Sequence, residues 1–379
     1  MNTVMDNRNR NYGIDLLRGI AMFFVICQHI IGQGGLLENA VMGSGKFWVL
    51  SFAQILVYCA VNIYGITTGY LLCRKAFRLN RVVKIWMTTV FWSVAVSCCF
   101  FALVPESRTV EEAVSMFLPI LRGRYWFFTA YFVVMLVSPA LNVLIHSMSR
   151  RQFLLLFAAL FVIFGIVPVG ALGNDVLRIS EGHHFSWMVI LYLIGGYLRL
   201  HGEQITAKLG KNRSGMWLAG YFLFAAAHLL YKFVVVQIGL EGLSGLLLTY
   251  PSPLILGEAV CLFLYFCGTG KRISGGSVLG KCIRFAAPGV YSVYVIHVHP
   301  KVFWNAGIIG LFRAWDSWNV LTVCAAMIGT AAALFTVCVC LDAVRQWLFR
   351  SCGIDRMVTN VSDWMETKVR NLLADKPMI

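Results

Sequence analysis

The sequence predicts an all-α, polytopic membrane helix bundle with about ten transmembrane helices and both termini in the cytoplasm. Three observations lead to this fold class. The mean hydropathy is +0.74. Hydrophobic residues make up 59% of the 379 residues and charged residues only 13%, about half the charged fraction of a soluble domain. Windows of about 18 or more largely apolar residues, long enough to cross a bilayer as helices, recur along the chain.

The spans are joined by short polar connections, and a polar tail follows the last one. The tail mixes apolar and basic residues, which suits an amphipathic helix on the inner leaflet or a simple solvated terminus. We therefore divide the chain into a membrane domain, residues 1–344, and a cytoplasmic tail, residues 345–379. The expected spans are 14–32, 47–73, 82–104, 125–145, 153–172, 185–200, 215–236, 254–268, 286–305 and 318–343.

The net charge of +15 is distributed in alternate loops. If the amino terminus is cytoplasmic, the inner loops hold about three times as many lysines and arginines as the outer loops, as the positive-inside rule requires. This arrangement supports an even number of spans. It also argues against a nucleic acid partner, because the cations flank the spans at the surface of the lipid bilayer instead of forming one basic patch.

The first span carries a charged and titratable stripe. Arg18 and His29 are separated by eleven positions, which correspond to about 16 Å along a helix and return the chain to the same face. Asp15 lies three residues before Arg18 and shares that face. Such side chains are costly in a bilayer unless they face a protein interior or a wet cavity. His29 alone would suit a packing contact, whereas three such residues on one face favour a functional site.

A second concentration of charge lies at residues 74–84, at the inner end of the third span. Cations at this position suit a polyanionic cytosolic ligand, since they form charge-assisted hydrogen bonds with phosphate. Arg81 and Lys84 are the best candidates because their spacing puts them on one helix face. Ordinary anchoring at the inner leaflet is the alternative.

Other polar residues could line a substrate cavity. Asn62 precedes a run of small residues and threonines, which suits either close helix packing or a cavity wall. Trp126 suits either an interfacial aromatic belt or a platform for a sugar ring. His297 and His299 point to opposite sides of a helix, so one faces inward and they do not form a metal chelate, and Pro300 would kink or end that helix. No Cys-x-x-Cys pair occurs, and we expect no metal site.

The segment from Asn11 to Ala21, followed by His29, resembles the opening of the acyltransferase-3 family of membrane acyltransferases. The Arg-x10-His spacing of Arg18 and His29 is the hallmark of that family. The supporting matches extend from about residue 10 to residue 305, which is nearly the whole membrane domain. They are Val61-Asn62 with Gly69-Tyr70, Arg81-Val-Val-Lys84, Trp126-Phe-Phe-Thr-Ala-Tyr131, Ser138-Pro139, Ser252-Pro253 and Tyr294-Val-Ile-His297-Val-His299-Pro300.

The resemblance implies an O-acetyltransferase in the inner (plasma) membrane. Such an enzyme moves an acyl group, usually acetyl from cytosolic acetyl-CoA as co-substrate, to a hydroxyl of an extracytoplasmic carbohydrate such as capsule, exopolysaccharide or lipopolysaccharide. His29 matches the catalytic histidine and Arg18 the arginine paired with it. Arg81 and Lys84 match an Arg-x-x-Arg pair with lysine in the second place, although Arg78-x-x-Arg81 offers a second frame.

We expect His29 to be the general base for direct transfer, with a covalent acyl-histidine as the less favoured route. Arg18, Arg81 and Lys84 would bind the phosphates of the donor. A membrane transporter of a sugar or lipid-linked solute is the alternative function, since about ten spans and an intramembrane charge stripe also suit a carrier. The expected substrate-binding residues are Asp15, Asn62, Trp126 and His297.

Overall fold

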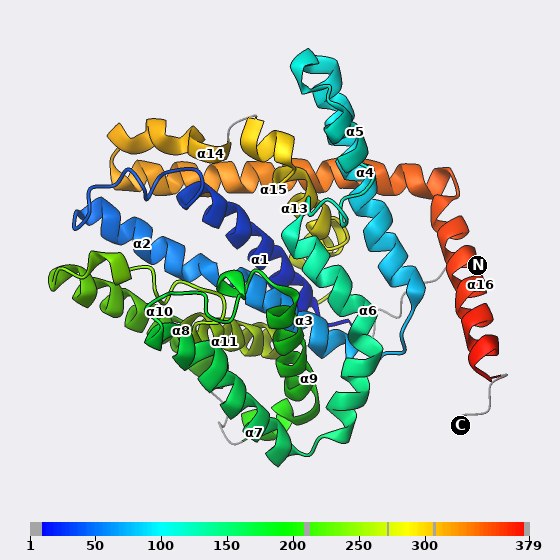
Figure 1. Ribbon diagram of the computed structural model, residues 1–379, viewed down its shortest axis with the longest axis horizontal. Helices are drawn as coiled ribbons and strands as arrows, with labels where there is room; N and C mark the ends of the chain where they lie inside the picture. Colours follow the sequence, from blue (N-terminus) through cyan, green and yellow to red (C-terminus); the bar gives the residue numbers. More distant parts are fainter. Residues whose placement is uncertain (1–9, 208–212, 271–272, 306–307, 375–379) are drawn as a thin grey trace.

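The chain folds as a bundle of helices, shown in Figure 1 as a computed structural model, and no strand occurs in the part that the structure describes. The all-α prediction is therefore confirmed. Seven helical segments of the described chain are long and apolar enough to cross a membrane, and Pro253–Thr269 is a shorter apolar helix. The structure describes residues 10–207, 213–270, 273–305 and 308–374.

A helix occupies each of the expected spans. In chain order the helices are α1 (Tyr12–Ile31), α2 (Gly45–Tyr58), α3 (Ala60–Leu72), α4 (Leu79–Leu103), α5 (Val110–Ser115), α6 (Trp126–Ser147), α7 (Arg150–Phe161), α8 (Val167–Gly170), α9 (Phe185–Ala207), α10 (Arg213–Gln237), α11 (Pro253–Thr269), α12 (Val278–Ala286), α13 (Val290–His297), α14 (Ile308–Leu311), α15 (Val320–Ser351) and α16 (Ile354–Ala374).

The ninth expected span, 286–305, differs most from a continuous helix. α13 ends at His297, and a π-helical turn, Lys301–Asn305, follows it. Pro300 explains the interruption because proline lacks the backbone N–H and its ring clashes with the preceding turn. Eight helical residues extend only about 12 Å, so α13 ends inside the bundle instead of crossing it.

α1 is a central helix, packed against α2, α3, α11, α13 and α15. Small residues bring other helices close together. A Cβ atom added to Gly69 on α3 would lie 1.9 Å from the carbonyl oxygen of Tyr192 on α9, so only glycine allows this contact. The small residues of α3 therefore serve close helix packing, one of the two interpretations of this run. α3, which packs against α1, is thereby held close to α9.

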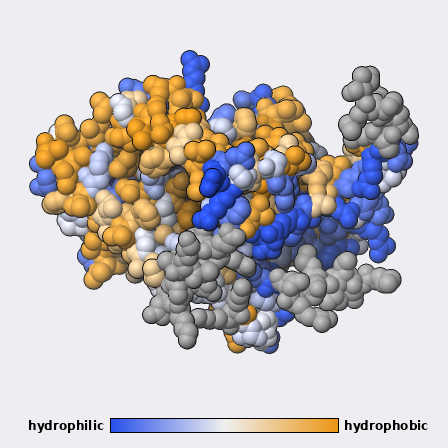
Figure 2. Space-filling view, turned by 90° about the horizontal axis from the view of Figure 1, so that it is seen from below, coloured by the Kyte–Doolittle hydropathy of each residue, from blue (hydrophilic) through white to orange (hydrophobic). Residues whose placement is uncertain are grey.

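The expected boundary after residue 344 falls inside a helix, because residues 345–351 of the expected tail continue α15. The following residues form α16, which packs against the start of α4 at the end of α15 (Figure 1). Glu366 accepts a hydrogen bond of 2.5 Å from the Leu79 backbone, and Arg78 lies 3.6 Å from the Asp363 carboxylate. Trp364 belongs to an exposed apolar stripe on another face of α16. Residues 375–379 of the expected tail lie outside the described residues. Figure 2 shows hydrophobic residues over the left of the molecule and hydrophilic residues gathered at its centre and right.

Candidate active site

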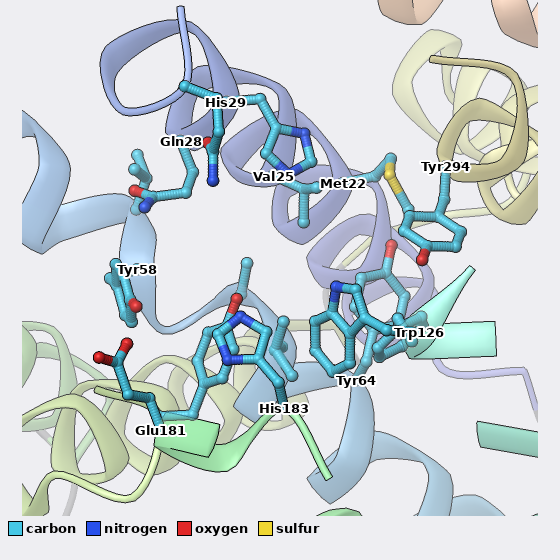
Figure 3. Close-up of a pocket in the computed structure, with 16 residues that line it drawn as sticks. Met22, Val25, Gln28, His29, Tyr58, Tyr64, Trp126, Glu181, His183 and Tyr294 are labelled. Atoms are coloured by element: carbon cyan, nitrogen blue, oxygen red, sulfur yellow. The ribbon is translucent and has the colours of Figure 1, made fainter. Parts of the chain in front are cut away.

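A cavity of about 210 Å³ lies at the carboxyl end of α1 (Figure 3). Its walls come from α1, the break between α2 and α3, the start of α6, the turn at residues 180–183 and the loop before α11. Aromatic and amide side chains dominate the lining, and none of the described lining residues is a lysine or arginine. These residues are Met22, Val25, Gln28, His29, Gln33, Val57, Tyr58, Ala60, Val61, Tyr64, Trp126, Phe127, Glu181, His183, Tyr250 and Tyr294.

His29 projects from α1 into this cavity (Figure 3) and is hydrogen-bonded to His297 at the end of α13. Its Nδ1 atom lies 3.1 Å from Nε2 of His297, and Nδ1 of His297 lies 2.6 Å from the carbonyl oxygen of Val293. A carbonyl oxygen can only accept a hydrogen bond, so Nδ1 of His297 carries the proton. Nε2 of neutral His297 then accepts a hydrogen bond from Nδ1–H of His29. These partners assign the proton of neutral His29 to Nδ1, so that Nε2 is unprotonated and has a free lone pair.

The ring of His29 is held by its neighbours as well as by this hydrogen bond. Phe303, in the turn after α13, packs edge-on against it at a centroid distance of 5.1 Å. His297 is 1% exposed, so its hydrogen bond is shielded from solvent. Beside His29, the side-chain oxygen of Gln28 is buried in the cavity wall without a hydrogen-bond partner. This acceptor is therefore available to a polar ligand or a water molecule in the cavity.

Trp126 forms part of an aromatic wall opposite α1. Its ring lies 4.6 Å from His183 and is stacked on Tyr250 at 6.0 Å, and Tyr58 packs on Tyr250 at 5.0 Å. The tryptophan thus lines the cavity, as the platform interpretation requires. No sequence pattern points to His183, Tyr58 or Tyr250, because single aromatic residues in loops and at helix ends form no recognisable motif.

Asn62 lies behind this wall. It is fully buried, donates a hydrogen bond of 2.8 Å to the carbonyl of Tyr250 and accepts one of 2.9 Å from Trp187. Both ends of the amide are therefore engaged within the protein. Asn62 holds Tyr250 in place and does not itself line the cavity.

Arg18 and Asp15 lie toward the other end of α1 and do not contact His29. The Asp15 carboxylate pairs with Arg10 at 2.6 Å and with Arg18 at 3.8 Å, and all three side chains are partly exposed. Tyr64 connects this group with the cavity, since it lines the cavity and its hydroxyl donates a hydrogen bond of 2.7 Å to the Arg18 carbonyl. The expected stripe therefore lies along one helix face but forms two separate groups, Asp15 with Arg18 at one end and His29 at the other.

The cations at the start of α4 differ in their partners. Arg78 is engaged by the carboxylates of α16. Arg81 donates to the carbonyl of Ala76 at 3.1 Å, and Lys84 is exposed. Over the described part of the chain, no carboxylate lies within ion-pair distance of Arg81 or Lys84. The Arg-x-x-Arg pair can be aligned with Arg78 and Arg81 or with Arg81 and Lys84. Only in the second alignment are both cations free of carboxylate partners among the described residues and able to bind an external anion.

A second buried polar cluster supports the end of α13. Arg124 pairs with Glu112 and lies 2.7 Å from Nε2 of His299 and 3.0 Å from the hydroxyl of Ser97. Burial acts to raise the pKa of Glu112, but the hydrogen bonds from Arg124 and Ser97 and the nearby charge of Arg124 outweigh it and hold that pKa below its usual value. Both histidines of the ninth span are buried, His297 toward His29 and His299 toward Arg124, although the sequence predicted only one facing inward.

Within the described residues, no group of three or more His, Cys, Asp or Glu side chains is placed to hold a metal ion.

A family model described as "Acyltransferase domain" matches residues 11–341. This segment begins at Asn11, the residue that caps the amino end of α1, and ends within α15, so it includes the cavity and both groups on α1. No match was found among curated proteins or among solved structures. Since the matched segment covers most of the 379 residues, the chain belongs to the acyltransferase-3 family of membrane acyltransferases.

Proposed function

We propose that this acyltransferase moves an acetyl group from cytosolic acetyl-CoA to a hydroxyl of an extracytoplasmic carbohydrate, such as capsule, exopolysaccharide or lipopolysaccharide, in the inner membrane. One observation carries the proposal. The imidazole of His29 lies in an aromatic cavity with its Nδ1 atom 3.1 Å from Nε2 of His297. Membership of an acyltransferase family argues against the transporter alternative.

His29 is the general base in this mechanism. Its Nε2 takes the proton from the acceptor hydroxyl as the hydroxyl oxygen attacks the thioester carbonyl carbon. The imidazolium that forms keeps its Nδ1–H bond to neutral His297, whose own Nδ1–H is held by the Val293 carbonyl. The chain of two histidines and a carbonyl thus fixes the tautomer and orientation of the base and stabilises its charged form.

The transfer is completed when the bond between carbonyl carbon and sulfur breaks. The ester then carries the acetyl group, and the departing sulfur takes the proton from Nε2 of His29, which yields free CoA and restores the neutral base. Direct transfer needs no covalent bond to the enzyme. Among the side chains that line the cavity and carry polar hydrogens are Gln28 and Gln33, and their amides could donate to the oxyanion of the tetrahedral intermediate.

The cavity lining suits a carbohydrate acceptor. Trp126 is partly exposed, so its ring, stacked on Tyr250, offers apolar surface for a pyranose ring. The unpartnered oxygen of Gln28 would accept a hydrogen bond from a sugar hydroxyl. Ligand sites of this kind combine aromatic walls with a few polar groups that fix orientation.

Cations would bind the phosphates of the donor. Arg18 lies about 16 Å along α1 from His29, a separation that the extended pantetheine arm of acetyl-CoA can bridge between thioester and phosphates. Asp15, paired with Arg18, would orient its guanidinium. Arg81 and Lys84 would provide further charge-assisted hydrogen bonds at the start of α4.

The test uses the purified protein reconstituted in liposomes of mixed orientation, with labelled acetyl-CoA outside and a glycan trapped inside. We expect labelled ester on the trapped glycan with the wild-type protein and none with His29→Ala. Retention of wild-type transfer by His29→Ala would overturn the assignment of the base. Transfer only to glycan on the donor side would overturn the proposed extracytoplasmic acceptor.

A further inference from the structure

We infer that a second cavity binds the sugar units that flank the acetylated one, and that Glu181, between the two cavities, selects neutral or amino sugars over acidic ones. This inference rests on the proposed function, because it concerns the acceptor of that same site. It assigns the cavity a role and narrows the acceptor to a glycan of low negative charge.

The second cavity has a volume of about 340 Å³, within the range of ligand sites. It lies between two loops, one preceding α9 and the other joining α10 to α11. Both apolar and polar side chains line it. Among them are Leu172, Asp175, Leu177, Leu243, Thr249 and Glu181.

Glu181 lines both cavities, and no other described residue does. In Figure 3 its carboxylate lies at the edge of the first cavity, beside the ring of Tyr58. The carbonyl of Glu181 accepts a hydrogen bond of 3.2 Å from the backbone of Tyr250, which belongs to the aromatic wall. A glycan that has one ring beside His29 and continues into the second cavity would therefore pass this carboxylate.

The backbone holds Glu181 in a strained conformation. Its φ is 55°, and Arg178 and Ser180 also have positive φ angles, which residues with a side chain rarely adopt. The carboxylate of Asp175 fixes the turn by accepting hydrogen bonds of 2.8 Å and 2.7 Å from the backbone of Ile179 and Ser180. Strain that the surrounding structure maintains in this way is typical of ligand-binding segments.

Charge provides the selectivity. The described residues that line the two cavities include the carboxylates of Glu181 and Asp175 but no lysine or arginine. An acidic sugar at the junction would meet like charge without a compensating cation, whereas the hydroxyls of a neutral sugar or the ammonium of an amino sugar could donate to Glu181. Uronic acids and phosphorylated sugars are therefore disfavoured at this position.

The experiment compares acetyl transfer by the full-length protein to neutral, amino and uronic acid oligosaccharides. We expect the wild-type protein to prefer the first two. Glu181→Gln should lower kcat/KM for the neutral acceptor by up to about tenfold, since the acceptor of the hydrogen bond loses its charge. Glu181→Lys should shift the ratio of neutral to uronic acid acceptors by about tenfold or more toward the acidic one. An unchanged ratio in Glu181→Lys would overturn the inference.

A second variant tests the flanking-sugar subsite. Gly245 lines the second cavity and has open space around an added Cβ, so Gly245→Trp fills the cavity without backbone strain. We expect it to lower the ratio of transfer to an oligosaccharide over transfer to a monosaccharide. Gly45→Trp is the matched control, because Gly45 also has open space and lines neither cavity. Equal ratios in the two variants would contradict the subsite.

Equilibrium binding of the same glycans to His29→Ala protein separates this inference from the proposed function. The inference is supported if the protein binds neutral glycans more tightly than acidic ones and Glu181→Lys reverses this preference. This holds even if no variant transfers acetyl. Transfer by the wild-type protein without any dependence on Glu181 would leave the proposed function intact and refute the subsite.

Discussion

Replacing His297 by leucine removes the acceptor for Nδ1 of His29 while keeping an apolar side chain of similar volume. In the structure Nε2 of His297 lies 3.1 Å from Nδ1 of His29, and no other hydrogen-bond partner of His29 Nδ1 is seen among the described residues. The variant should therefore free the ring to rotate and to change tautomer. It should also leave the imidazolium of the transition state without its hydrogen bond.

The magnitude follows from the type of bond. A hydrogen bond to a group that becomes charged contributes about 1.5–3 kcal/mol, which corresponds to a loss in kcat of roughly 10- to 150-fold. KM for donor and acceptor should change little, because the bond strengthens only as His29 gains its proton. Removing the base itself, in His29→Ala, should cost more, about 10²- to 10⁴-fold.

The assay measures the initial rate of CoA release in the presence of a glycan acceptor, with thermal unfolding in detergent as a check on folding. His297→Gln is the matched control, since its side-chain oxygen can still accept the Nδ1–H bond. We expect His297→Gln to retain more kcat than His297→Leu. Wild-type kcat in His297→Leu, or equal losses in the two variants, would refute the role of His297 in positioning the base.

Arg81→Ala should raise KM for acetyl-CoA about tenfold through the lost phosphate contact, with the acceptor KM unchanged; steady-state kinetics would contradict this if both KM values moved together. Glu112→Gln should lower stability at pH 7 by about 3 kcal/mol, because it leaves the buried Arg124 unpaired. Since the folded-state pKa of Glu112 lies below its usual 4.5, its stabilisation is complete above pH 4.5 and is lost as the pH falls through the folded pKa. Unfolding curves of wild type and variant should therefore converge in acid, and a gap independent of pH would count against this. Gly69→Ala should lower the unfolding temperature through its clash with Tyr192, whereas Gly329→Ala, in open space, should not.

The sequence predicted the features that depend on local pattern. Apolar windows located the helices, because a span must satisfy its own backbone hydrogen bonds within one segment. Pro300 indicated the interruption of the ninth span for a similarly local reason. The spacing of Arg18 and His29 placed them on one helix face, and the structure adds that they belong to separate groups.

The pairing of distant residues could not be predicted in this way. His29 and His297 are 268 positions apart, and only the packing of α1 against α13 brings them together. Arg124 and its partner His299 are 175 positions apart, and only the fold brings them together in a buried cluster. No sequence pattern indicated a role for Glu181, since its position depends on a strained loop between two cavities.

The most direct test of the account is to identify the product of the purified protein, acetyl-CoA and a panel of surface glycans by mass spectrometry. The account predicts an O-acetyl ester on a glycan, formed together with free CoA by the wild-type protein and absent with His29→Ala. An ester formed at the wild-type rate by His29→Ala, or CoA release by the wild-type protein with no acetylated glycan, would contradict it.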